Sequence, residues 1–195
     1  MSAVSIKASA AQYASYWRRS EQGFVKDLAA TSRAIRLAAL VRAAAYFKVA
    51  RSFALEYDVK RGLPRVAPVL TILDEYGSLE LTRETLVPIV TELRRRLASA
   101  YNMSDLLSAA TKFLWLQHRH PVVIYDGNVR GALGSPYGDY SAYLERWHER
   151  YEELEDEIRI ATDALASTPG LPADTEWFRR RVFDIYMWNS GGTNA

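Results

Sequence analysis

The chain has 195 residues, enough for one domain or for two small helical lobes that share a core, and 49% of the residues are hydrophobic. Because it has no cysteine and three histidines, disulfide bonds and thiolate metal sites are excluded and little remains for a zinc site. The net charge of +2 gives no argument for nucleic acid by itself, and no apolar run reaches the roughly 20 residues that span a bilayer.

Helical periodicity runs through nearly the whole chain. Residues 22–57 are rich in Ala, Leu and Arg but too long for one uncapped helix, so we expect a break near Thr31 and Ser32. The last helix begins near Asp174 and Thr175 and ends at Gly191 and Gly192. Further segments carry apolar residues at helical spacing: 66–73, 86–97, 106–117, 140–158 and 178–186. The sequence therefore predicts an all-α fold of roughly seven to nine helices.

Residues 121–134 interrupt this pattern. A β-branched run at 122–124 has no convincing partner strand, so we expect an extended connector there. Asp126 follows as the N-cap of a helix that stops at Gly134. A carboxylate in this place is expected to stay ionised, because the helix dipole and the unpaired backbone N–H groups favour its charged form. Such an anion can stabilise developing positive charge or activate a water, and the simpler alternative is that Asp126 only caps the helix.

The order of a helix at 104–117, a connector, an aspartate and a second helix resembles the aspartate motif of the helix-hairpin-helix DNA glycosylase superfamily. In that family the segment usually reads Pro-Val-Asp-x-His-Val-x-Arg. Matched to it, Asp126 takes the place of the catalytic aspartate, Asn128 takes the histidine position, and Arg130 lies one place ahead of the usual arginine. The resemblance has motif support over residues 80–135.

The resemblance implies a two-lobed helical bundle with the active site in the cleft between the lobes. We expect a single helical domain over residues 1–195, with candidate lobes at 1–80 with 135–195, and at 80–135. The implied activity is excision of a modified base from double-stranded DNA, which breaks an N-glycosidic bond through an oxocarbenium-like sugar after the nucleotide is extruded. The base is either alkylated or otherwise damaged, or a hypermodified base of phage DNA. No metal or cofactor is needed, and we expect a cytoplasmic monomer without a membrane partner.

Two departures from the family pattern bear on the mechanism. The family's hairpin carries Leu-Pro-Gly-x-Gly, whose backbone amides bind a DNA phosphate, whereas residues 100–105 contain no glycine. Bifunctional members use a lysine near the start of the following helix, where Ser108 stands here, and Lys112 lies one turn later. We therefore expect a monofunctional enzyme that leaves an abasic site, with Lys112 as the lysine to test for a lyase step.

Several side chains are candidates for contacts with the substrate or with DNA. Tyr125 and Trp115 either pack in the core, the commoner role of such aromatics, or stack on a base. Asn128 either holds the carboxylate or a phosphate, or reflects the preference of its residue type for helix starts. The turn at His118 and Arg119 is equally a DNA contact or a solvated loop. The full set is Lys112, Trp115, His118, Arg119, Tyr125, Asn128 and Arg130.

The distribution of charge leaves rival functions open. Residues 145–157 hold seven acidic side chains and two arginines, so we expect a solvated helix face turned away from DNA. The arginine runs at 94–96 and 179–181 are expected to divide between phosphate contacts and ion pairs, because successive helix positions point in different directions. The alternatives to an enzyme are a non-catalytic helical DNA-binding module and a helical protein-interaction subunit.

Overall fold

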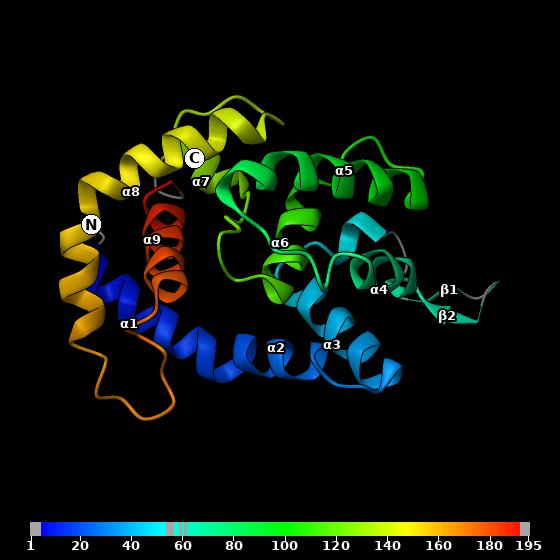
Figure 1. Cartoon of the computed structure of the whole chain (residues 1–195), viewed down its shortest axis with the longest axis horizontal. Coiled ribbons are helices and arrows are strands. Elements are labelled where there is room, and N and C mark those ends of the chain that lie inside the picture. Colours follow the sequence, from blue (N-terminus) through cyan, green and yellow to red (C-terminus); the bar gives the residue numbers. More distant parts are fainter. Residues whose placement is uncertain (1–4, 54–56, 59, 61, 192–195) are drawn as a thin grey trace. The chain divides into compact units, whose positions relative to one another are not determined.

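In the described part of the chain, the regular secondary structure is helical apart from one short β-ladder (Figure 1). The structure is a computed structural model, and it describes residues 5–53, 57–58, 60 and 62–191. The elements are α1 (Ile6–Tyr16), a π-helical turn (Trp17–Glu21), α2 (Gln22–Leu28), α3 (Arg33–Tyr46), a 3-10 turn (Ala50–Phe53), β1 (Tyr57–Asp58), β2 (Leu63–Pro64), α4 (Ala67–Asp74), α5 (Arg83–Tyr101), α6 (Leu107–Gln117), α7 (Gly127–Ala132), α8 (Tyr140–Asp163) and α9 (Glu176–Gly191). The predicted all-α class is confirmed.

Local signals in the sequence explain where the helices begin and end. Helix α5 starts with a capping box in which Thr82 and Thr85 satisfy each other's backbone N–H groups, and it ends at Asn102 with a positive φ of 52°. The break expected near residue 31 separates α2 from α3. Helix α3 ends at Tyr46, short of the predicted end near residue 57, because Lys48 takes a φ of 57° and closes the helix.

The segment around the connector agrees with the sequence in outline. Residues 122–126 form no strand, which confirms the extended connector. Helix α7 is a single short helix, and Gly134 follows it with a φ of 61°. Helix α6 begins at Leu107 rather than near residue 104, because the carboxylate of Asp105 accepts a hydrogen bond from the Leu107 backbone N–H at 2.8 Å.

The chain divides into two compact units. The N/C unit contains residues 1–19 and 123–195, with α1, α7, α8 and α9, and the middle unit contains residues 20–122, with α2 to α6. The predicted lobe at 80–135 falls across this division, since α5 and α6 belong to the middle unit and α7 to the N/C unit. The reason is that α7 packs against α9, which no local pattern in the sequence indicates.

Aromatic side chains fill the interior of the N/C unit. Tyr13 of α1 packs against Phe178 of α9, with ring centroids 4.8 Å apart, and Trp147 of α8 packs edge-on against Phe183 at 4.9 Å. Helix α7 packs against α9 so closely that a Cβ atom on Gly191 would lie 2.3 Å from the backbone oxygen of Asn128. Glycine is therefore required at this crossing for steric reasons.

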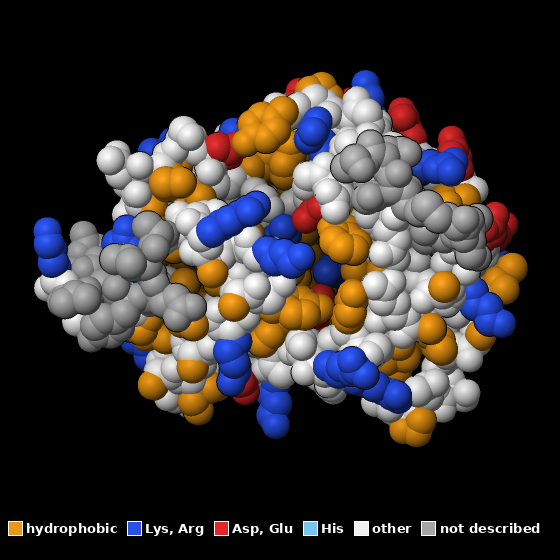
Figure 2. Space-filling view, turned by 180° about the vertical axis from the view of Figure 1, so that it is seen from behind, with side chains coloured by type: hydrophobic (Ala, Val, Ile, Leu, Met, Phe, Trp, Pro, Cys, Tyr) orange, Lys and Arg blue, Asp and Glu red, His pale blue; other side chains and the backbone are white. Residues whose placement is uncertain are grey.

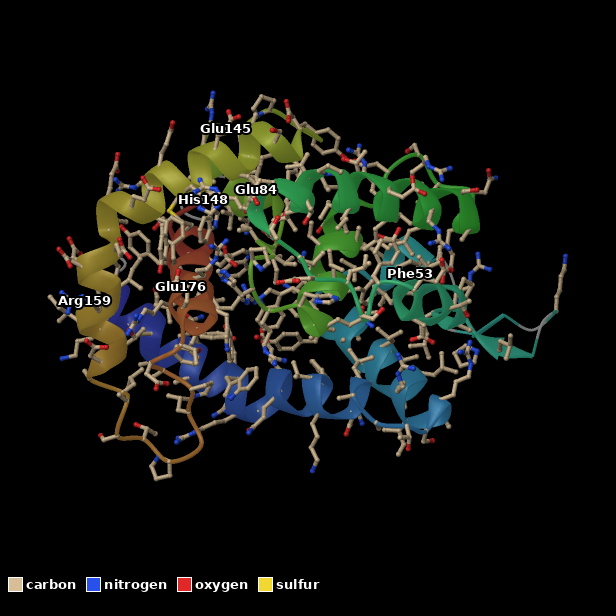
Figure 3. All side chains as sticks on the ribbon, in the orientation of Figure 1. Phe53, Glu84, Glu145, His148, Arg159 and Glu176 are labelled. Atoms are coloured by element: carbon tan, nitrogen blue, oxygen red, sulfur yellow. The ribbon has the colours of Figure 1, made fainter. Side chains whose placement is uncertain are left out.

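The acidic stretch of α8 lies on the outside. All seven of its acidic residues between 145 and 157 are exposed, which confirms the predicted solvated face. Figure 3 shows Glu145 and Arg159 on parts of α8 that face away from α9. Arg159 pairs with Asp156 at 3.0 Å on the same helix surface. This face is exposed to solvent rather than packed in the interior.

The interior of the middle unit is mainly aliphatic. Leu70 of α4, Leu93 of α5 and Leu114 of α6 are fully buried, as the predicted stripes require. Phe53, labelled in Figure 3, adds an aromatic ring whose centroid lies 4.7 Å from that of Tyr101. Among the described residues, no helix is long and apolar enough to cross a membrane.

Candidate functional site

Asp126 lies where the connector turns into α7. Its backbone is extended, with φ −133° and ψ 142°, and its carboxylate accepts a hydrogen bond from the Asn128 backbone N–H at 3.0 Å. The Arg130 N–H donates to the Asp126 carbonyl at 2.8 Å, which is the first full turn of the helix. The predicted N-cap is therefore present, and the side chain of Asp126 is half-buried rather than sealed inside the protein.

The connector before Asp126 is held by tyrosine hydroxyl groups. Tyr140 donates to the Val123 carbonyl at 2.7 Å, and Tyr143 donates to the Ile124 carbonyl at 2.8 Å. Both tyrosines lie in the first turn of α8, and both rings are buried. A buried carbonyl without a partner costs about 1–3 kcal/mol, so these bonds fix the path of the backbone that leads to Asp126.

Burial keeps these hydroxyl groups protonated. It raises the pKa of Tyr143 well above the usual tyrosine value, and the nearby carboxylates of Asp184 and Asp126 raise it further. Burial also raises the pKa of Tyr140. Both side chains therefore remain hydrogen-bond donors over the whole range in which the protein is expected to be folded.

A buried charged cluster lies on α9 and faces α8. The carboxylate of Asp184 accepts a hydrogen bond from Trp147 Nε1 at 2.7 Å and lies 3.4 Å from Arg181 Nη1. Burial raises the pKa of Asp184 to about 6, against the opposing effects of Arg181 and Trp147. The Arg180 guanidinium lies 4.8 Å from the Trp147 ring, and burial lowers its pKa. The N/C unit thus keeps two arginines and one aspartate in its interior.

This cluster was not predicted from the sequence. Asp184 was not among the candidate residues, although it follows Arg180 and Arg181 at helical spacing and falls within the apolar stripe of α9. An acidic residue inside such a stripe, one turn after two arginines, is the signal that could have identified it. Arg179, the first residue of that run, instead pairs with Asp163 at 3.3 Å.

The predicted contact residues of the N/C unit take different places. Tyr125 is buried, and its hydroxyl oxygen accepts a hydrogen bond from the Gly138 N–H at 2.9 Å, so it packs in the core. Asn128 is exposed on the first turn of α7. Arg130 is half-buried, and its Nη1 donates to the Ser135 carbonyl at 3.0 Å. These residues come together with Asp126 around one short helix.

The other predicted contact residues belong to the middle unit. Lys112 is buried, and its Nζ donates to Ser108 Oγ at 2.9 Å. Trp115 is 2% exposed, which accords with a role in the core. The His118 ring Nε2 lies 2.8 Å from the Tyr76 carbonyl, and Arg119 is half-buried in the same turn. A contact of any of these side chains with substrate stays a prediction.

The arginines of the middle unit are extensively ion-paired. Within the run at 94–96, Arg94 pairs with Asp105 at 2.8 Å, and Arg96 binds Glu75 through two hydrogen bonds of 2.8 and 2.6 Å. Arg95 pairs with a carboxylate on its own helix. Figure 2 shows lysine and arginine side chains at many separate places on one face. Because its guanidinium groups are paired, the arginine run at 94–96 contributes less positive charge to a surface than the sequence indicated.

The middle unit also contains a cavity of about 320 Å³. Its wall includes Arg65, Thr71, Arg96 and Tyr101, none of which is a predicted site residue. Within the described part of the chain, His, Asp and Glu side chains form no group of three that could hold a metal ion. The functional candidate with the most complete local geometry remains Asp126.

Comparison with known proteins adds no relative to these observations. No protein-family model, no curated protein and no solved structure matches this chain. What can be stated of its class is that it is an all-helical protein with a half-buried aspartate at a helix start.

Proposed function

We propose that this chain is a monofunctional DNA glycosylase that hydrolyses the N-glycosidic bond of a modified base in double-stranded DNA, with Asp126 as the catalytic carboxylate. The observation that carries the proposal is the half-buried Asp126 carboxylate at the start of α7, on a connector whose carbonyls are fixed by Tyr140 and Tyr143. The resemblance of residues 80–135 to the aspartate motif of the helix-hairpin-helix glycosylases supports the same assignment.

The chemistry requires a fixed negative charge. When the bond between C1′ and the base nitrogen breaks, the base leaves with the electron pair and the sugar becomes oxocarbenium-like. A preorganised carboxylate beside the sugar stabilises that cation, and a water then adds at C1′ and loses a proton. Asp126 suits this role because one of its carboxylate oxygens accepts a hydrogen bond from the Asn128 N–H at the start of α7 and its carbonyl accepts one from the Arg130 N–H.

A lysine of the middle unit bears on whether the enzyme is monofunctional or has a lyase step. A lyase step needs an amine that attacks C1′. Lys112 Nζ is buried and engaged with Ser108 on its own helix, which favours a packing role. We therefore propose simple hydrolysis to an abasic site. We also propose that the enzyme acts as a cytoplasmic monomer. The base is alkylated or otherwise damaged, or is a hypermodified base of phage DNA.

The experiment compares wild type with Asp126→Asn on duplexes that carry alkylated, oxidised or hypermodified bases. Abasic sites are detected by strand cleavage with alkali. Because Asn also caps helices well, the substitution should preserve α7, while loss of the charge should lower the excision rate by about 100-fold or more. Asp139→Asn is the matched control, because Asp139 caps α8 through the Ala142 N–H at 3.0 Å and lies in the same unit. Equal excision by wild type and Asp126→Asn contradicts the proposal.

One observation favours a second candidate, a helical DNA-binding module without catalysis. The hydrogen bond from the Asn128 N–H to Asp126 is what a simple N-cap makes, so this aspartate has a structural role in any case. A binding module predicts strongly salt-dependent DNA affinity and no abasic sites on any duplex. The same gel assay, combined with binding measurements at two salt concentrations, separates the two candidates.

A further inference from the structure

The turn between α7 and α8 presents an aromatic side chain to solvent. Tyr137 is 77% exposed, the largest exposed fraction of any large hydrophobic side chain among the described residues. It lies between Pro136 and Gly138 in a segment that begins directly after α7. Single exposed hydrophobic residues are common on protein surfaces, so exposure by itself indicates nothing.

What distinguishes this turn is how firmly its backbone is held. Ser135 and Arg130 exchange two hydrogen bonds of 3.0 Å, one from the Ser135 N–H and one from the Arg130 guanidinium. The Gly138 N–H donates to the hydroxyl of the buried Tyr125 at 2.9 Å. Gly134 and Gly138, on either side of Tyr137, both have a positive φ, of 61° and 74°. The exposed ring thus projects from a turn with a defined backbone, which reduces the entropy lost on binding.

A guanidinium group accompanies the ring. The Arg130 guanidinium carbon lies 6.0 Å from the centre of the Tyr137 ring. A flat aromatic ring next to an arginine is a combination with which proteins hold unstacked bases, because the ring stacks on a base and the cation attracts the phosphate. In a duplex, extrusion of the target nucleotide exposes one face of a neighbouring base to such a ring. An isolated tyrosine on a tight turn lacks the contiguous apolar area that a protein partner would cover.

The position of this pair relates it to Asp126. The Arg130 N–H bonds to the Asp126 carbonyl, so the two residues are one helical turn apart, a rise of about 6 Å. Bases along one DNA strand repeat at about 3.4 Å. The Arg130 and Tyr137 pair therefore lies within the span of a few nucleotides from Asp126.

We propose that Tyr137 stacks on a DNA base that flanks the excised nucleotide, with Arg130 beside the strand's backbone. This inference rests on the proposed function for the identity of the partner. It assigns substrate binding to a residue outside the aspartate motif.

The test measures binding without excision. Asp126→Asn is titrated against a duplex that contains a stable abasic-site analogue, with 2-aminopurine at the flanking positions. Adding Tyr137→Ala should weaken binding by about 5- to 150-fold, the effect of losing one base–aromatic stack, and should abolish the fluorescence change at one flanking position. Tyr137→Phe keeps the ring and should bind within about threefold of the parent. Ile160→Ala is the control for loss of an exposed apolar side chain, since Ile160 is 64% exposed on α8.

The outcomes separate this inference from the glycosylase proposal. Unchanged binding by Tyr137→Ala overturns it, as does an equal loss in Tyr137→Phe, which would assign the effect to the hydroxyl group. Absence of any DNA binding by the Asp126→Asn parent also overturns it. If wild type forms no abasic sites but Tyr137→Ala weakens binding, the stacking contact stands and the glycosylase proposal fails. Because Tyr137 is so exposed, thermal unfolding should show equal stability for both variants and the parent.

Discussion

In the middle unit most charged groups lie on the outside, whereas the N/C unit encloses several of them. Arg96 and Glu75, which pair on the surface of the middle unit, are typical of the first arrangement. Asp184 and Arg181, which lie in the interior of the N/C unit, are typical of the second. Lys112 and Glu21 are buried exceptions in the middle unit.

The difference affects how precisely each unit can hold a side chain in place. An aliphatic interior tolerates small rearrangements, because hydrophobic contacts are not directional. An interior with hydroxyl groups and charges has fewer acceptable arrangements, because each buried polar group needs a partner in a defined direction. In the N/C unit those directional bonds surround the connector that carries Asp126. Five predictions, from the largest expected effect to the smallest, test this contrast.

Phe53→Ala should have the largest effect on the middle unit. Phe53 is 2% exposed and packs against Tyr101 and Phe113, so its loss leaves a large cavity. The free energy of unfolding should fall by about 3–5 kcal/mol. Denaturant unfolding measures it, and the loss should be the same at pH 5 and pH 7, because no titrating group takes part. A strong pH dependence of the loss would contradict a simple packing role.

Asp184→Ala should have a similar effect on the N/C unit for a different reason. The substitution removes the acceptor of Trp147 Nε1 and the carboxylate next to Arg181. Breaking a buried ion pair from one side costs about 3–5 kcal/mol, measured by denaturant unfolding at pH 7. Asp184→Asn, which keeps an acceptor for Trp147, should lose less. Wild-type stability in Asp184→Ala would mean that the cluster does not hold the interior together.

The pH dependence of stability should show the burial of Asp184 directly. Its pKa is about 6 in the folded protein, above the usual aspartate value of 3.8, so the folded state binds the proton more tightly than the unfolded state does. Stability from this group is therefore greatest below about pH 4 and is lost as the pH rises to about 6. Relative to Asp184→Asn, the wild type should lose up to roughly 3 kcal/mol of unfolding free energy over that range. A difference between the two proteins that does not change with pH would contradict the burial of an ionisable group.

Tyr143→Phe should have a modest effect on stability and a specific one on excision. The ring stays, but the Ile124 carbonyl loses its partner, which costs about 1–3 kcal/mol. If the connector positions Asp126, kcat should fall by up to about 100-fold with little change in KM. Tyr151→Phe is the matched control, because its hydroxyl donates to Glu176 at 3.1 Å and does not contact the connector. Equal kcat values for the two variants would contradict the positioning role.

Asp27→Ala should have the smallest effect. Asp27 pairs with Arg42 on the surface of the middle unit, where the side chain of Arg42 is 54% exposed. Exposed pairs contribute about 0–1 kcal/mol, less at high salt, and denaturant unfolding at two salt concentrations measures it. A loss comparable to that of Asp184→Ala would remove the contrast between the two units.

The sequence predicted what local patterns determine. The stripe from Leu86 to Leu97 specifies α5, and the step from a β-branched run to Asp126 specifies the connector and the N-cap, because each depends on neighbours within a few residues. The catalytic role of Asp126 stays a prediction.

Contacts over long distances along the chain were not predicted. The bond from Tyr143 to Ile124 joins residues 19 positions apart, and helical spacing identifies Tyr143 only as an apolar position. The same limit applies to the packing of α7 on α9. Hydrophobic periodicity shows which face of a helix is buried and not which partner covers it.

The close approach of Gly191 to Asn128 couples the end of α9 to the first turn of α7 through direct steric contact. The space admits a hydrogen atom and excludes a methyl group, so alanine at position 191 would push α7 aside and carry the Asp126 carboxylate with it. A substitution more than sixty positions away along the chain would therefore disturb the aspartate's placement while leaving every residue of the connector unchanged.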